Sequence, residues 1–141
     1  MEPLDAAALA DGALLLVDST PIIYTLEAHA RFAARFAPMF QRHADGEIVL
    51  AVTTITIAEV LSGPLKVGEE ALAKRYRAVL EGWQVVDFTC DIAESAARLR
   101  GKYSLKLPDA IQVASALSIN AGALVTHDRD FANVRGLRIL V

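Results

Sequence analysis

The sequence contains a single cysteine, Cys90, and few aromatic residues, which make up 6% of its 141 positions. One cysteine can form neither an intramolecular disulfide nor a cysteine-based zinc cluster, and it indicates a reducing, cytoplasmic setting. The scarcity of aromatic rings leaves no evident platform on which nucleobases could stack. Chemistry must therefore be sought among the charged and hydroxyl side chains.

Long apolar runs and an excess of positive charge are also missing. No stretch approaches the ~20 apolar residues that a membrane-spanning helix needs, so we expect no membrane association. The acidic start, MEPLDAAALADG, lacks the basic residues that open a signal peptide. The net charge of −3 argues against a protein that grips nucleic acid by bulk positive charge. It leaves open an enzyme that acts on nucleic acid through local basic patches or a bound metal.

Hydrophobic residues, by contrast, make up 54% of the sequence, which is enough for a sizeable core. The length suits one domain, and we expect it to cover residues 1–141. Residues 1–12 form an N-terminal extension for which a short helix and a frayed tail are equal expectations.

Short apolar runs alternate with amphipathic stretches along the whole chain. The runs predict strands at residues 13–17, 48–52, 83–88, 123–126 and 137–141. The first predicted helix covers 21–43, with Thr20 as its N-cap and a break near Pro38; the second ends at Gly63-Pro64. Continuous apolar strands are typical of parallel sheets that are covered on both faces. We therefore predict a three-layer α/β/α sandwich around a mostly parallel, five-stranded sheet.

Three carboxylates, Asp18, Glu59 and Asp109, stand isolated in apolar or small-residue stretches, and a fourth, Asp128, lies two residues before Asp130 in VTHDRDF. Asp18 and Asp128 follow predicted strands, Asp109 lies in the first turn of a helix, and Glu59 lies in the helix after the second strand. Each has an ordinary interpretation when taken alone, such as a favourable interaction with a helix dipole. Together they can converge beyond the carboxyl ends of the strands, where parallel sheets bind ligands. Clustered acids need a cation, and the hard ions Mg²⁺ and Mn²⁺ prefer oxygen ligands.

Four motifs resemble those of one known family, in that family's order and spacing, over roughly residues 14–141. They are VDSTPIIY (17–24), TTITIAEVLSGP (53–64), LPDAIQVASAL (107–117) and LVTHDRDF (124–131). The resemblance is to the PIN domain, and within it to the VapC-like toxin ribonucleases. It implies catalytic and metal-binding roles for Asp18, Glu59, Asp109 and Asp128, with Thr126, Ser19 and Asp130 in support. His127 departs from the family pattern, in which an asparagine is common.

The resemblance further implies a metal-dependent endoribonuclease that hydrolyses RNA phosphodiester bonds with Mg²⁺ or Mn²⁺. Such proteins are often homodimers, and VapC toxins are held inactive by a VapB antitoxin. Two alternatives stay open, a stand-alone RNA-processing PIN nuclease and a catalytically silent PIN-fold binding module. The complete acidic set favours an enzyme over the silent module.

Two surface features of the sequence have open interpretations. Basic residues recur in clusters, among them Arg31, Arg35 and Arg42, that either contact RNA or form ordinary solvated helix faces. An apolar stripe recurs at helical spacing over residues 32–40. It belongs either to the core or to a groove that a partner helix could enter.

Overall fold

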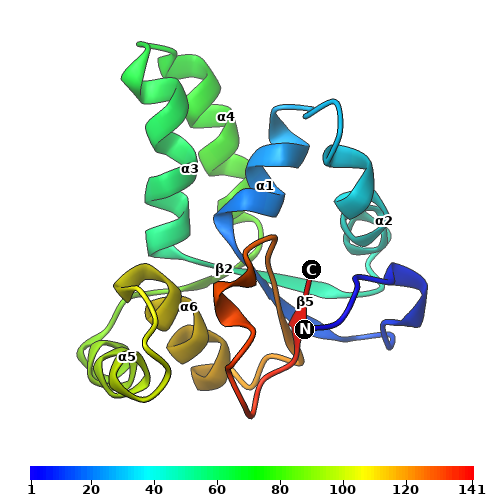
Figure 1. Cartoon of the computed structure of the whole chain (residues 1–141). Coiled ribbons are helices and arrows are strands. Elements are labelled where there is room, and N and C mark those ends of the chain that lie inside the picture. The colour runs from blue at the N-terminus through cyan, green and yellow to red at the C-terminus, as the bar shows by residue number, and fades with distance from the viewer.

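In the computed structural model, which describes residues 1–141, one parallel sheet separates two layers of helices (Figure 1). The strands are β1 (Leu14–Val17), β2 (Val49–Thr53), β3 (Gln84–Val86), β4 (Ala123–Val125) and β5 (Ile139–Leu140). The helices are α1 (Ser19–Leu26), α2 (Ala33–Ala44), α3 (Thr54–Lys66), α4 (Glu70–Glu81), α5 (Cys90–Tyr103) and α6 (Leu107–Ser118), with short 3₁₀ helices η1 (Ala6–Ala8) and η2 (Arg129–Phe131). None of the helices combines the length and apolar character that crossing a membrane requires.

The strand order β3-β2-β1-β4-β5 confirms the predicted three-layer sandwich, and every strand pair is parallel. From β1 the chain builds outward through β2 and β3, then returns to place β4 on the other side of β1. The strand order therefore reverses between β1 and β4. In open parallel sheets this is where ligands bind, beyond the carboxyl ends of the strands.

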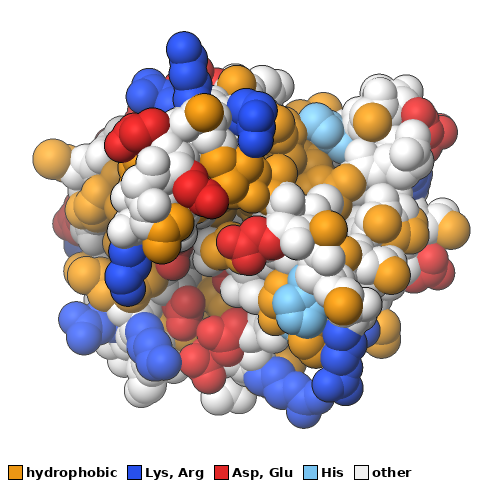
Figure 2. Space-filling view, turned by 90° about the horizontal axis from the view of Figure 1, so that it is seen from above, with side chains coloured by type: hydrophobic (Ala, Val, Ile, Leu, Met, Phe, Trp, Pro, Cys, Tyr) orange, Lys and Arg blue, Asp and Glu red, His pale blue; other side chains and the backbone are white.

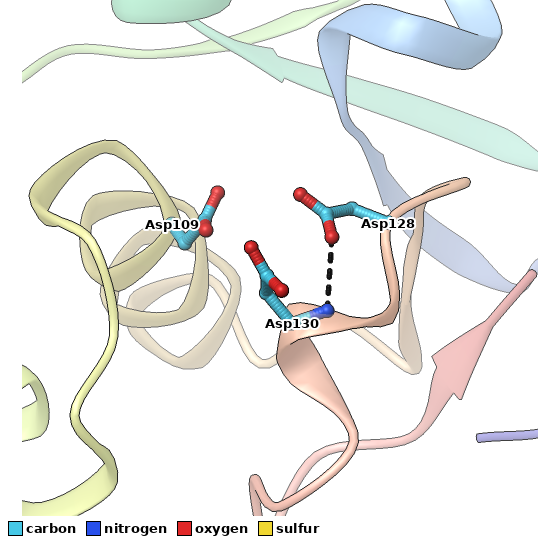
Figure 3. A group of neighbouring side chains, drawn as sticks. All are labelled: Asp109, Asp128 and Asp130. Atoms are coloured by element: carbon cyan, nitrogen blue, oxygen red, sulfur yellow. Dashed lines mark hydrogen bonds between the residues drawn. The ribbon is translucent and has the colours of Figure 1, made fainter.

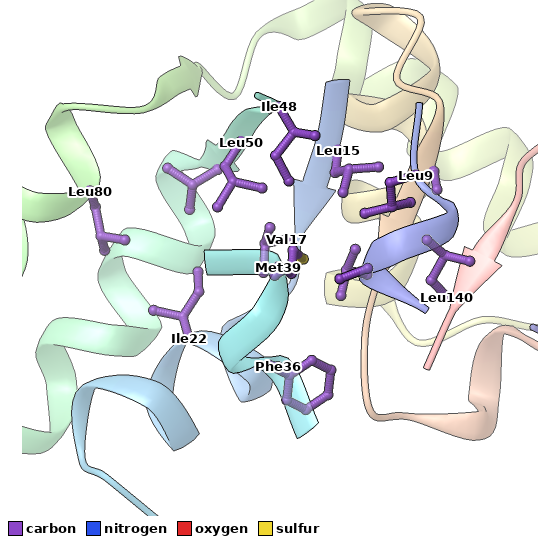
Figure 4. Close-up of a cluster of buried hydrophobic side chains, with 14 of the residues drawn as sticks. Leu9, Leu15, Val17, Ile22, Phe36, Met39, Ile48, Leu50, Leu80 and Leu140 are labelled. Carbon is purple, nitrogen blue, oxygen red and sulfur yellow. The ribbon is translucent and has the colours of Figure 1, made fainter. Parts of the chain in front are cut away.

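The two faces of the sheet carry alternate residues of each strand, as the period of two requires. Leu15 and Val17 pack with the side chains of α1 to α4 in one core cluster, part of which is shown in Figure 4. Leu16 points the other way, into a second cluster that includes Ala96 of α5 and Ile111 of α6. Burial on both faces explains why β1 and β4 read as continuous apolar runs.

Three predicted helix boundaries are wrong. The chain breaks at residues 27–32 and not near Pro38, which lies inside α2 between the fully buried Phe36 and Met39. Pro64 also lies inside its helix, α3, where it is buried, and does not end it. Proline removes one helical hydrogen bond, but the packing of its neighbours outweighs that local signal. The first helix is capped by Asp18 instead of Thr20.

Residues 1–12 are tied to the edge of the sheet. The backbone of Glu2 pairs with β5, because Glu2 N–H donates to Ile139 O (2.8 Å) and Val141 N–H donates to Glu2 O (2.9 Å). The η1 turn then packs Ala6 and Leu9 into the first core cluster. Pairing of this kind covers an edge strand that would otherwise present unpaired backbone groups.

Arg42 is the side chain that fastens this segment, and its replacement by alanine is expected to loosen it. Its guanidinium donates to Ala6 O (2.7 Å) and Leu9 O (2.6 Å), and pairs with Asp11 and Glu47 (2.7 and 2.8 Å). Because several charge-assisted bonds of a largely buried side chain are lost, we expect Arg42→Ala to lower the free energy of unfolding by about 2 kcal/mol.

Urea unfolding measures this loss, with Arg77→Ala as the control. Arg77 forms an exposed pair with Glu81 within one helix, whose removal should cost less than about 0.5 kcal/mol. Equal losses in the two variants would show that Arg42 does not fasten the N-terminal segment.

Candidate active site

Asp18 is a buried carboxylate that three donors satisfy. It follows β1 directly and is the N-cap of α1. Its Oδ1 accepts hydrogen bonds from Ser19 N–H and Gln112 Nε2, both at 2.9 Å. Its Oδ2 accepts one from Thr126 Oγ1, also at 2.9 Å. This full set of donors explains how a carboxylate is tolerated at the tip of an apolar strand.

Gln112 connects Asp18 to the second strand and its helix. Its side chain, only 1% exposed, also donates to Thr56 Oγ1 (2.6 Å) and accepts from Thr53 Oγ1 (2.9 Å). Thr53 in turn caps α3 by accepting from Thr56 N–H (3.0 Å). The network thus links the ends of β1 and β2 to α6, and it fixes the orientation of the Asp18 carboxylate.

Three further carboxylates converge beside this network (Figure 3). One oxygen each from Asp109, Asp128 and Asp130 lies within 4.8 Å of the other two. Asp128 is held by its N–H, which donates to Thr126 Oγ1 (3.0 Å), and Asp130 N–H donates to Asp128 Oδ1 (2.9 Å). Thr126 therefore orders two acids at once, Asp18 after β1 and Asp128 after β4. We refer to Asp109, Asp128 and Asp130 as the acidic group.

Asp109 is the member of the acidic group whose negative charge is least favourable. Burial, together with the negative charges of Asp128, Asp18 and Asp130 and against the opposing effect of Lys106, raises its pKa to about 6. Its Oδ2 is buried and has no hydrogen-bond partner. A buried carboxylate oxygen without a partner, on a side chain that lies beside other carboxylates, is the arrangement that a bound cation would satisfy.

Glu59 lies close enough to these carboxylates for their charges to affect its pKa. Partial burial raises its pKa, the charges of Asp18 and Asp109 add to the rise, and a hydrogen bond from Ser19 opposes it. Glu59 nonetheless lies on an exposed part of α3, so solvent screens much of this repulsion and it can exchange protons with water. Its position on the rim differs from that of the buried Asp18.

All seven residues singled out from the sequence therefore lie at one edge of the sheet, at the reversal of strand order. Asp130, expected only in support, contributes an oxygen to the acidic group, whereas Asp18 and Glu59 act on that group through their charge. Lys106 Nζ reaches to 3.8 Å from Asp130 Oδ2 at the rim. In Figure 2, basic side chains lie on both sides of a group of acidic ones.

Sequence reasoning missed Gln112, Thr53 and Thr56. The one available signal was a single amide, Gln112, in the otherwise apolar or small-residue run AIQVASA. Such an amide must find partners when it is buried. The partners themselves come from residues 56 to 94 positions away, which no local pattern reveals.

We expect Gln112→Met to destabilise the fold, although methionine has a similar shape and is well suited to a buried site. The hydroxyl groups of Thr53 and Thr56 and the Asp18 carboxylate each lose a partner, which should lower the free energy of unfolding by about 2 kcal/mol. Urea unfolding provides the measurement. Gln41→Met, at an exposed position of α2, is the matched control and should change stability by less than about 0.5 kcal/mol. A Gln112→Met variant as stable as its control would contradict the importance of the network.

The fold and the site define a three-layer α/β protein whose acids converge where the strand order reverses, and comparison with known proteins gives it a family. The sequence profile of the PIN domain matches residues 15–137. A chain of a toxin-antitoxin complex from Klebsiella pneumoniae is 31% identical, with 90% of this chain and 95% of that chain covered and a TM-score of 0.68. No curated protein sequence matches the chain.

Two more distant structures share the fold. VapBC2 from Rickettsia felis, bound to a DNA fragment from its promoter, gives a TM-score of 0.71 at 17% identity, covering 89% of this chain and 96% of that chain. VapC20 from Mycobacterium tuberculosis, a toxin that cleaves the sarcin-ricin loop, gives 0.67 at 15% identity, covering 84% and 92%. The chain belongs to the PIN domain family, and its fold is similar to those of VapBC2 and VapC20.

Proposed function

We propose that the protein is a metal-dependent endoribonuclease and the toxin of a toxin–antitoxin pair. The convergence of Asp109, Asp128 and Asp130 within 4.8 Å, with one buried oxygen left without a partner, carries this proposal. PIN family membership supports nuclease chemistry, and VapC20 is a structural relative that cleaves the sarcin-ricin loop. RNA as the substrate also favours a cytoplasmic location.

The donor set fits a divalent ion. The acidic group supplies only carboxylate oxygens, which Mg²⁺ and Mn²⁺ prefer, and Asp18 and Glu59 add negative charge close by. Asp109, Asp128 and Asp130 would hold the ion, with Asp18 and Glu59 completing the site directly or through water. Such an ion polarises a phosphate and stabilises the charge on the leaving oxygen.

The chain's own residues have distinct tasks in this proposal. Asp18, fixed by its three donors, keeps the geometry of the site, and Thr126 and Ser19 orient their neighbouring acids. Glu59 is exposed and its raised pKa favours accepting a proton, so it is placed to take one from the attacking water. Lys106 at the rim is placed to contact a phosphate of the bound strand.

The direct test is cleavage of RNA by the purified protein, with single-stranded RNA and duplex DNA offered in parallel. We expect RNA to be cut in the presence of Mn²⁺ or Mg²⁺ and left intact in EDTA. Cleavage that survives EDTA would exclude the metal-dependent mechanism. Intact RNA under all ion conditions would favour the catalytically silent module.

A VapB-like antitoxin is the proposed partner, since structural relatives were solved as toxin-antitoxin complexes. A cavity of about 240 Å³ between α1, α2 and α4 is lined by Phe40, Val79 and Trp83 among others, and it suits apolar side chains of such a partner. The stripe over residues 32–40 thus divides, because Phe36 and Met39 are core whereas Phe40 lines this cavity.

The antitoxin and the proposed homodimer can be tested on the same protein. Growth arrest on expression, relieved by the product of an adjacent gene, would support a toxin. The absence of growth arrest would favour a stand-alone processing nuclease.

Light scattering should give a mass twice that of the 15.2 kDa chain if the protein is a homodimer.

A further inference from the structure

A cluster of aromatic and histidine rings adjoins the acidic group at the end of β4. His127 stands between Thr126 and Asp128, and its Nδ1 lies 3.2 Å from the hydroxyl of Tyr24. The ring centroid of Phe32 lies 4.7 Å from that of His127 and 5.0 Å from that of Tyr24. The rings of Tyr24, Phe32 and His127 are half-buried, so each keeps part of its surface in solvent. The ring cluster consists of Tyr24, His29, Phe32, Phe36 and His127.

The ring cluster is held in place before any ligand binds. His29 Nδ1 accepts from the backbone N–H groups of Arg31 (3.2 Å) and Phe32 (3.1 Å), which closes the turn between α1 and α2. His29 N–H donates to Tyr24 O (2.8 Å). Beneath them lies Phe36, fully buried and 5.9 Å from His127. A preorganised surface loses little conformational freedom on binding.

Positive charge accompanies the rings. The guanidinium of Arg31 lies 5.1 Å from the centroid of the Phe32 ring, and the side chains of Arg31 and Arg35 are exposed. The guanidinium of Arg35 donates to Val141 O (2.6 Å). Charged and aromatic groups are therefore combined on one side of the acidic group. The protein as a whole is acidic, so this combination does not follow from its composition.

Building on the endoribonuclease function proposed above, we propose that the ring cluster, with Arg31 and Arg35, is the subsite for the unpaired nucleotide next to the scissile phosphate. The base lies against the half-buried rings, and the guanidinium groups contact the adjoining phosphates. Aromatic surface combined with basic side chains is how proteins bind single strands, since every base presents a face for stacking. A base inside a duplex cannot offer that face, so the subsite selects unpaired RNA.

The test measures binding of a labelled single-stranded RNA oligonucleotide by fluorescence anisotropy. An Asp109→Asn background keeps the RNA intact. We expect Phe32→Leu, which keeps an apolar side chain but loses the ring, to weaken binding about tenfold. Arg31→Ala/Arg35→Ala should weaken binding about tenfold and reduce the slope of log Kd against log salt by about 1.4. Thermal unfolding confirms that each variant is folded.

The matched control is Lys74→Ala/Arg75→Ala on α4, which removes the same charge from a helix that carries no residue of either group. It should change binding by less than twofold. The Phe32→Leu effect should vanish when the same RNA is offered as a duplex. Equal weakening by both charge variants, unchanged binding in Phe32→Leu, or no binding of RNA by the parent would each overturn the subsite.

Cleavage assays separate the failure of this inference from failure of the proposed function. If the parent cleaves RNA and the ring and arginine variants cleave with unchanged KM, the nuclease function is supported and the subsite is contradicted. If the parent binds RNA through the ring cluster but does not cleave it, the subsite is supported and the nuclease function is contradicted. Loss of antitoxin binding with unchanged RNA affinity would assign the surface to the protein partner instead.

Discussion

Replacing Asp109 by asparagine is expected to abolish RNA cleavage while making the metal-free protein more stable. The substitution removes a proposed ligand, which should reduce cleavage by more than about a hundredfold. It also removes a half-buried charge that repels Asp128, Asp18 and Asp130. Allowing for solvent screening, relief of this repulsion should raise the free energy of unfolding by about 1 kcal/mol at pH 7.5.

The pH dependence of stability shows at which pH Asp109→Asn is more stable than the parent protein. The pKa of Asp109 rises from 3.8 to about 6 on folding, so between these values the folded state holds a proton that the unfolded state has lost. Stability therefore falls as the pH rises through this window, and the penalty is fully present above pH 6. Asp109→Asn should be more stable than the parent at pH 7.5 and equally stable below about pH 4.

Urea unfolding in EDTA at the two pH values measures the effect. Asp91→Asn is the matched control, because Asp91 occupies the first turn of α5 as Asp109 does that of α6. Asp91→Asn should lose a small favourable interaction with the helix dipole, about 0.5 kcal/mol, and keep full cleavage. A destabilised Asp109→Asn at pH 7.5 would mean that the carboxylates do not repel one another as described.

Asp18→Asn is expected to lose cleavage as severely but to change stability in the opposite direction. An amide presents one NH₂ group where the carboxylate presents a second acceptor. The side chains of Gln112 and Thr126 both donate to Asp18, so one of these donors must lose its acceptor. We expect the free energy of unfolding to fall by about 2 kcal/mol.

The same unfolding experiment measures this loss. Asp5→Asn provides a control, since Asp5 caps η1 through a single exposed hydrogen bond at 3.0 Å and should tolerate an amide. Opposite stability changes at Asp18 and Asp109, together with equal loss of cleavage, would distinguish a carboxylate held by donors from one that awaits a cation. Unchanged stability in Asp18→Asn would show that its donors do not require the charge.

The layers of the fold could be predicted because their cause is local. Most strands are short apolar runs, and the spacing between β1, β2, β3 and β4 leaves room for helices and forces parallel crossovers. Asp18 and Asp128 could be located because they follow strand residues in the sequence, and parallel strands end at one edge. The prediction failed for helix boundaries such as that at Pro38, where burial of the flanking Phe36 and Met39 decides the outcome.

Contacts between distant segments could not be predicted. Gln112 reaches Asp18 across 94 positions without any local signal, whereas the role of Thr126, which reaches Asp18 across 108 positions, was indicated only by the family resemblance. The ring cluster shows the same limit, because a chain with 6% aromatic residues gave no sign of a stacking surface. Its rings come from α1, the following turn, α2 and the end of β4, and only the fold brings them beside the acidic group.

Calorimetric titration of the metal-free protein with Mn²⁺ tests the central claim most directly. We predict saturable binding that is lost in Asp109→Asn and retained in Asp91→Asn. At pH 6 binding should also release protons, because Asp109 is then partly protonated and must ionise to bind the ion. The absence of binding, or binding that Asp109→Asn leaves unchanged, would contradict a cation site built from the acidic group.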